Sequence, residues 1–179
     1  MRRRTFLTAA AATAAVPSLP RPSRAQGSAR VLRFVPEGNL NNPDPIWTTT
    51  TVARNHGLMI WDMLYALDGS FAPQPQMVAG HTVSDDRLTW RFTLRDGLIF
   101  HDGAQVRPID CITSITRWAK RRPLGQKLLE LTADMKPIDD KSFEIRLTKP
   151  YPMMTYTLSD WCFVMPERIA KTDPFKQIT

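Results

Sequence analysis

The stretch TWRFTLRDGLIFHDG, residues 89–103, decides the fold. Apolar side chains alternate with polar ones from the residue before this stretch through its first half, a period of two that is typical of a strand with one buried face. The apolar residues are Leu88, Trp90, Phe92 and Leu94. Asp-Gly pairs at 96–97 and 102–103 indicate turns, because glycine takes positive φ and aspartate bonds to the backbone two residues on. We therefore expect a strand, a turn, residues 98–100 pairing back onto that strand, and a second turn.

The pair His101-Asp102 within this stretch raises the question of catalysis, since a histidine oriented by a carboxylate can act as a general base. Such a base also needs a nucleophile. The sequence has no Gly-x-Ser-x-Gly, no His-Glu-x-x-His and no glycine-rich phosphate loop, and its three histidines are scattered. We interpret the pair as part of a turn, and predict no enzyme activity, no catalytic residue, no cofactor and no metal site.

The rest of the chain predicts short, mixed elements, in keeping with its 15 prolines. Helical spacing of apolar residues predicts one helix from about 52 to 67, after the threonines at 48–51, and a second over 109–119 that Pro123 stops. A second hairpin is expected over 135–147. A Pro-opened short helix and an apolar strand follow it, and the strands at 31–35 and 161–165 are expected to be neighbours in a sheet. Together these elements predict an α+β fold.

The N-terminus has the order of a secretory signal: arginines, an alanine-rich run too short to span a bilayer, prolines, and small residues before a cleavage site near Ala25. The pair Arg3-Arg4 followed by Phe6-Leu7 favours the twin-arginine route. A native basic amphipathic helix is the alternative. Residues 1–25 hold five arginines and no acid, so their removal takes the formal charge from +7 to +2. Nucleic acid is therefore not an expected partner.

Three arginine or lysine residues remain together at 120–122, where the second helix should end. Cations there complement the helix dipole, which we favour over a phosphate site. The two cysteines, Cys111 and Cys162, each have apolar neighbours. We expect two buried free thiols, and a disulfide is the alternative in an oxidising compartment.

The order of these motifs resembles a known family. The segment runs from Asp44-Pro45 through a helix and a "DG" to LRDGLIFHDG, then to a helix around Asp110 and to residues 140–147. It is similar to the N-terminal part of the extracellular solute-binding proteins of family 5, the dipeptide- and oligopeptide-type binding components of ABC importers. The helix start at Arg107-Pro108 differs from the family's usual threonine. The resemblance implies an α+β fold like that of a type II periplasmic binding protein.

Applied to this chain, the resemblance implies four parts. They are a signal peptide (1–25), the first strand and loop of a larger lobe (26–48), a small α+β subdomain with two hairpins (49–160), and a return into the larger lobe (161–179). A monomer in the periplasm is expected, which binds peptides or similar small solutes and delivers them to an ABC permease in the membrane. The chain corresponds to about the first third of the family pattern, so a truncated fragment is expected. A non-functional fragment and a secreted enzyme are the alternatives.

The resemblance also implies where a ligand binds. In relatives that hold extended peptides, the segment after the first Asp-Pro gives backbone hydrogen bonds to the ligand, as an added strand would. That segment is Trp47, Thr48, Thr49 and Thr50 here, and Trp161 is a second candidate. For the threonines, capping of the following helix is an equally supported alternative. For both tryptophans the alternative is packing in the core, which we favour for Trp161.

Overall fold

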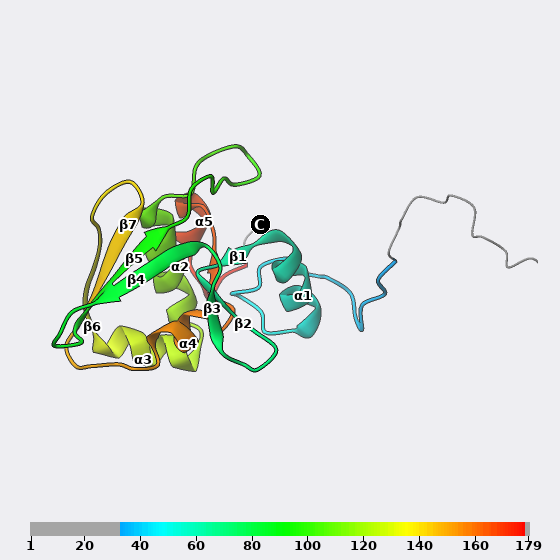
Figure 1. Cartoon of the computed structure of the whole chain (residues 1–179). Coiled ribbons are helices and arrows are strands. Elements are labelled where there is room, and N and C mark those ends of the chain that lie inside the picture. Colours follow the sequence, from blue (N-terminus) through cyan, green and yellow to red (C-terminus); the bar gives the residue numbers. More distant parts are fainter. Residues whose placement is uncertain (1–32, 178–179) are drawn as a thin grey trace, which may run out of the picture. The chain divides into compact units, whose positions relative to one another are not determined.

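A computed structural model describes residues 33–177 (Figure 1). The predicted signal peptide lies outside the described residues. The predicted strand at 31–35 is wrong in its described part, because Arg33–Val35 has no regular secondary structure. Phe34 is 62% exposed, so the apolar residues of this segment do not form a buried strand face.

A four-stranded antiparallel sheet is the centre of the unit that begins at Pro36 (Figure 1). Its strands are β4 (Val78–Val83), β5 (Thr89–Leu94), β6 (Thr132–Pro137) and β7 (Ser142–Leu147), in the order β4-β5-β7-β6. The alternation predicted for β5 is confirmed: its apolar side chains are buried, while Arg91 and Thr93 are exposed. Phe92 of β5 pairs with Phe143 of β7, and their rings stack with centroids 5.1 Å apart.

The first hairpin differs from the prediction. Both edges of β5 are occupied, by β4 and β7, so residues 98–100 cannot pair back onto it. Ile99 instead forms an isolated bridge to Gln105. The two predicted turns are confirmed, with φ of 74° at Gly97 and 84° at Gly103. The two hairpins of this sheet are therefore β4–β5 and β6–β7.

Helix α2 (Pro108–Ala119) confirms the predicted second helix and lies against the sheet (Figure 1). Its apolar face fills the core between helix and strands, and Ile115 and Trp118 are fully buried. Asp110, in the first turn of α2, reaches back to the residue that precedes the helix. Its carboxylate accepts a hydrogen bond from the backbone N–H of Arg107 at 2.8 Å, so one of the unpaired amides of the first turn is satisfied.

A further helix, α3 (Pro123–Leu131), was not predicted. Pro123 opens this helix rather than only ending the one before it, because the fixed φ of proline suits the first helical position. Gly125 allows α3 to approach α2 closely: a Cβ placed there would lie 2.4 Å from the Cα of Ala119. The connection of 120–122 is therefore tightly bent between two packed helices.

The first helix, α1 (Thr51–Ile60), ends earlier than its apolar spacing predicts. Residues 62–67 instead form β1 (Asp62–Met63) and β2 (Tyr65–Leu67). β1 pairs with β8 (Phe163–Val164), and β2 pairs with β3 (Pro73–Pro75). Consecutive side chains from Met63 to Tyr65 are buried, which a helix with one apolar face cannot achieve. The apolar strand near 161–165 is thus confirmed in a shorter form, with β1 as its partner.

Two short helices, α4 (Met154–Leu158) and α5 (Glu167–Ala170), complete the chain as described. The prediction of free buried thiols is confirmed for Cys111 and Cys162, and burial raises the pKa of both. Among residues 33–177, no helix is both long enough and apolar enough to cross a membrane.

Candidate functional site

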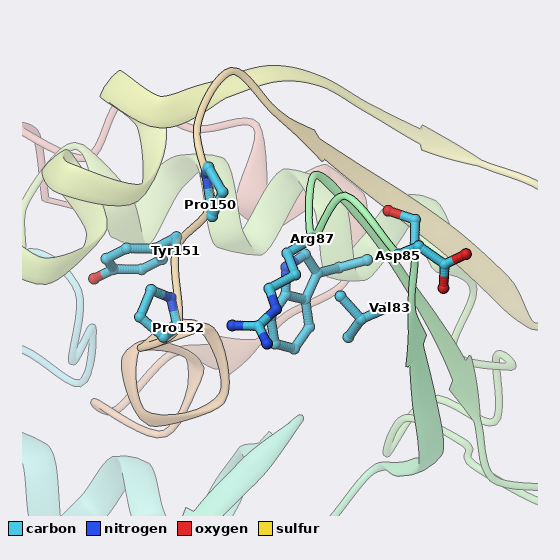
Figure 2. Close-up of a pocket in the computed structure, with 8 residues that line it drawn as sticks. Val83, Asp85, Arg87, Pro150, Tyr151 and Pro152 are labelled. Atoms are coloured by element: carbon cyan, nitrogen blue, oxygen red, sulfur yellow. The ribbon is translucent and has the colours of Figure 1, made fainter.

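A hollow of about 650 Å³ lies between the β4–β5 turn and residues 150–152 (Figure 2). Trp90 forms part of its wall, and the buried indole N–H of this residue has no acceptor within the described part of the chain. The polar ends of Asp85 and Tyr151 point away from Arg87 (Figure 2). The Tyr151 hydroxyl already bonds to Thr157 at 2.8 Å. Few polar groups therefore converge on this hollow, and a ligand site needs several that fix orientation.

A much smaller pocket contains three of the five predicted site residues, Thr48, Thr49 and Trp161. Its volume is about 20 Å³, roughly enough for one water-sized group. The remaining lining residues are Pro45, Arg54, Trp118, Arg122 and Phe163. Trp47 and Thr50 flank this pocket in sequence but do not line it. Segments more than 100 residues apart thus meet where the resemblance places the ligand.

The loop before this pocket is anchored by a buried ion pair. Arg117 of α2 donates to both carboxylate oxygens of Asp44, at 3.1 and 2.6 Å, and both side chains are 1% exposed. The same carboxylate accepts the N–H of Ile46 at 3.0 Å. Arg121 donates to the carbonyl of Trp47 at 2.7 Å. These contacts fix the path of the chain as it enters the threonine segment.

The backbone of Thr49 is the part of this segment that stays available. Its N–H and C=O make no hydrogen bond within residues 33–177. The N–H of Thr48 bonds to the carbonyl of Asp44 at 3.3 Å, and that of Thr50 reaches the Thr48 hydroxyl at 3.4 Å. Thr50 occupies the N-cap position of α1, yet its side chain makes no capping hydrogen bond. Helix capping therefore does not account for these hydroxyls.

Trp161 has an unusual backbone conformation, with φ of +50°. Left-handed backbone is rare for a bulky residue, and such strain concentrates at ligand sites. Two guanidinium groups lie over its ring, Arg54 at 4.5 Å and Arg122 at 4.9 Å from the centroid. The residue is half-buried and packs against the hydrophobic core, so part of it also lies at the surface.

The arginines of this pocket were not predicted as site residues. We expected residues 120–122 to complement the dipole of the preceding helix, but Arg121 reaches Trp47 and Arg122 forms two hydrogen bonds with Asp160, at 3.2 and 2.7 Å. Nothing in the local sequence indicates these partners, because they lie 74 and 38 positions away. Arg54 carries no signal in the sequence beyond its place on the helix after the threonines.

The pair His101-Asp102 is part of a turn, as expected. The Asp102 carboxylate accepts the N–H of Ala104 at 3.1 Å and pairs with Arg168 at 3.0 Å, and these contacts lower its pKa. The histidine side chain is exposed. In the described part of the chain, no three His, Cys, Asp or Glu residues are grouped so that they could hold a metal ion.

Comparison with known proteins identifies the family to which this fold belongs. A family model described as "Bacterial extracellular solute-binding proteins, family 5 Middle" matches residues 72–178. The chain is 40% identical over 172 residues to a probable peptide ABC transporter periplasmic-binding protein, y4tO, of Sinorhizobium fredii. That alignment covers 96% of this chain but 32% of the relative, so the chain spans about a third of that protein's length.

Two solved structures share its fold. The periplasmic binding protein AgaA of A. tumefaciens R10, in complex with agropinic acid, has a TM-score of 0.63 and 22% identity, with 72% of this chain and 27% of AgaA covered. OppA of Listeria monocytogenes, bound to peptide, has a TM-score of 0.61 and 20% identity, with 71% and 29% covered. The expected fold, part of a type II periplasmic binding protein, is confirmed. Because the family model matches more than half of the chain, this protein belongs to family 5 of the bacterial extracellular solute-binding proteins.

Proposed function

We propose that this chain serves as a substrate-binding component of an ABC importer, which binds peptides or similar small solutes and delivers them to a membrane permease. The observation that carries the proposal is the free backbone of Thr49 at a pocket shared with Trp161. An unpaired backbone N–H and C=O can pair with the backbone of a peptide, as an added strand does. The 40% identity to a probable peptide-binding protein supports the same class of ligand.

The parts of the chain take the roles expected from the family. Residues 49–160 are the small subdomain, and residues 26–48 and 161–179 contribute to the larger lobe. The first 25 residues direct export by the twin-arginine route, and the protein acts as a monomer in the periplasm. Periplasmic binding proteins among the relatives support this location.

Within the site, the backbone of Thr49 pairs with the ligand backbone while Trp161 covers an apolar part of the ligand. Trp47 does not contact the ligand. Its carbonyl accepts a hydrogen bond from Arg121, which fixes the direction of the threonine segment. The hydroxyls of Thr48 and Thr50 are turned toward each other, at 3.4 Å, and contribute less to the ligand.

Two variants of the 179-residue chain test whether the backbone binds the ligand. Replacing Thr48, Thr49 and Thr50 by alanine removes three hydroxyls but keeps every backbone donor. Thr49→Pro removes one N–H. With tri-alanine as the probe in calorimetric titrations, we expect Thr49→Pro to weaken binding roughly tenfold, the value of one hydrogen bond of about 1.4 kcal/mol. The triple alanine variant should change affinity less than about threefold.

Circular dichroism of both variants controls for folding. Equal and negligible losses in the two variants would remove this segment from the site. A larger loss in the alanine variant would assign recognition to the hydroxyls instead of the backbone.

A further inference from the structure

Strand β4 lies at one edge of the central sheet, and its outer side pairs with no strand in the described part of the chain (Figure 1). In an antiparallel pair, alternate residues direct both backbone groups at the partner strand. Ser84 donates its N–H to the carbonyl of Thr89 at 3.0 Å, so it faces β5. By alternation Thr82 also faces β5, while His81 and Val83 face away from it. The backbone groups of these two exposed residues are therefore available to another strand.

The opposite edge of the same sheet is protected, whereas this edge is not. Strand β6 carries Asp134 and Lys136, ends in Pro137 and has a register shift near its start. Charges, proline and bulges are the features by which proteins keep a strand edge from pairing with another chain. Strand β4 (VAGHTV) contains no Asp, Glu, Lys, Arg or proline, and its register shift is confined to 78–80. Residues 81–83 thus form a regular edge without protection.

The side chain of His81 keeps this edge ordered. Its Nδ1 forms a hydrogen bond of 2.7 Å with the hydroxyl of Tyr65, and its ring stacks on that of Trp90 with centroids 5.2 Å apart. Partial desolvation lowers the pKa of His81, so the imidazole is neutral at pH 7. An edge that is already ordered loses little conformational entropy when another strand pairs with it.

A second copy of the chain fits this edge through a two-fold axis at Thr82. In that register His81 of each copy pairs with Val83 of the other copy, and each pair exchanges two backbone hydrogen bonds. A two-fold interface requires a surface that is complementary to itself. Here every N–H meets a C=O, and no like charges face each other because the edge is uncharged. The cross-strand contacts, threonine with threonine and valine with an aromatic ring, are favourable ones.

We infer that two copies of this chain pair through β4, so that their sheets join into one across the two-fold axis. The inference goes beyond the proposed function and does not depend on solute binding. The regular part of the edge is short, so the contact is small and the dimer is weak. The monomer of the proposed function is then the form at low concentration, and the dimer forms as the concentration rises.

The average mass of the 179-residue chain in sedimentation equilibrium at pH 7.5 tests this inference. The mass should rise from that of one chain at about 10 µM toward that of two chains at about 1 mM. Thr82→Lys places like charges opposite each other at the axis, so this variant should keep the mass of one chain throughout. Thr93→Lys is the matched control, because Thr93 is equally exposed on the same sheet face but lies on the inner strand β5. It should dimerise as the wild type does.

Two further variants locate the contact at the axis. Mixing Thr82→Lys chains with Thr82→Glu chains should restore a dimer of mixed composition, because opposite charges then meet. A short bismaleimide should cross-link Thr82→Cys about tenfold faster than Thr93→Cys, since pairing holds the two new thiols close together. Cys111 and Cys162 are fully buried and do not compete for the reagent.

Two results would overturn the inference. The first is a mass that stays at one chain up to about 1 mM, with Thr82→Cys cross-linked no faster than Thr93→Cys. The second is a dimer that survives Thr82→Lys in a protein with wild-type circular dichroism, because the contact would then lie on another surface. The proposed function is tested separately, by tri-alanine binding at low protein concentration, so its failure and that of the dimer are distinguishable.

Discussion

Removing one partner of the Asp44–Arg117 ion pair should destabilise the protein more than any surface substitution. The two side chains are 1% exposed and joined by two hydrogen bonds, so Asp44→Asn leaves a guanidinium buried without an opposite charge. Stranding a buried charge in this way costs about 3–5 kcal/mol. The new amide N–H₂ also faces the guanidinium donors, which adds to the loss. Because whole domains are stable by only about 5–15 kcal/mol, the change takes about a fifth or more of the total.

The assay is urea unfolding followed by tryptophan fluorescence, applied to a double-mutant cycle. With a slope of about 2 kcal/mol per molar urea, the single variant should lower the midpoint by roughly 2 M. Arg117→Met in the Asp44→Asn background removes the stranded charge, so the double variant should be no less stable than the single one. Glu130→Gln is the control. It breaks the exposed ion pair with Lys127 and should lower the free energy of unfolding by less than about 1 kcal/mol. A loss below about 1 kcal/mol for Asp44→Asn, or additive effects in the cycle, would refute the reasoning.

Three further outcomes are expected. Gly125→Ala should lower the free energy of unfolding by about 1–3 kcal/mol in the same assay, because the new Cβ would overlap the backbone of α2. Gly69→Ala, with open space around it, should be nearly neutral. Similar losses in both variants would contradict the close contact between α2 and α3. Partial desolvation lowers the pKa of His81, an exposed residue of β4, so the unfolded chain takes up a proton first as the pH falls through about 6.5. Stability should therefore decline on acidification, and His81→Gln should flatten that decline in thermal melts at pH 5–8. Replacing Arg3 and Arg4 by lysine should leave the precursor in the cytoplasm on cell fractionation, and normal processing would rule out the twin-arginine route.

Local sequence patterns predicted the strand, turns and helix whose secondary structure does not depend on contacts with distant segments. The alternation in β5 and the turn pairs at 96–97 and 102–103 are confirmed, because side-chain period and glycine conformation are properties of the chain itself. The helix at 108–119 is confirmed for the same reason. The segment 62–67 was misassigned, since an apolar run of that length fits a helix or a buried strand equally well. Pairing of β1 with β8, a hundred residues later, decides it.

Some residues of the candidate site could be predicted from the sequence, and others could not. From the sequence and its family resemblance came the threonine segment and Trp161, and the structure brings three of those five residues to one pocket. The sequence could not identify the arginines near the pocket as site residues. The role of a guanidinium depends on which groups it contacts, and those contacts are set by tertiary packing. Sequence by itself determined the strand period, the turns and the family. Tertiary structure alone decided which strands pair and that Asp160 neutralises Arg122, because both depend on contacts between residues far apart along the chain.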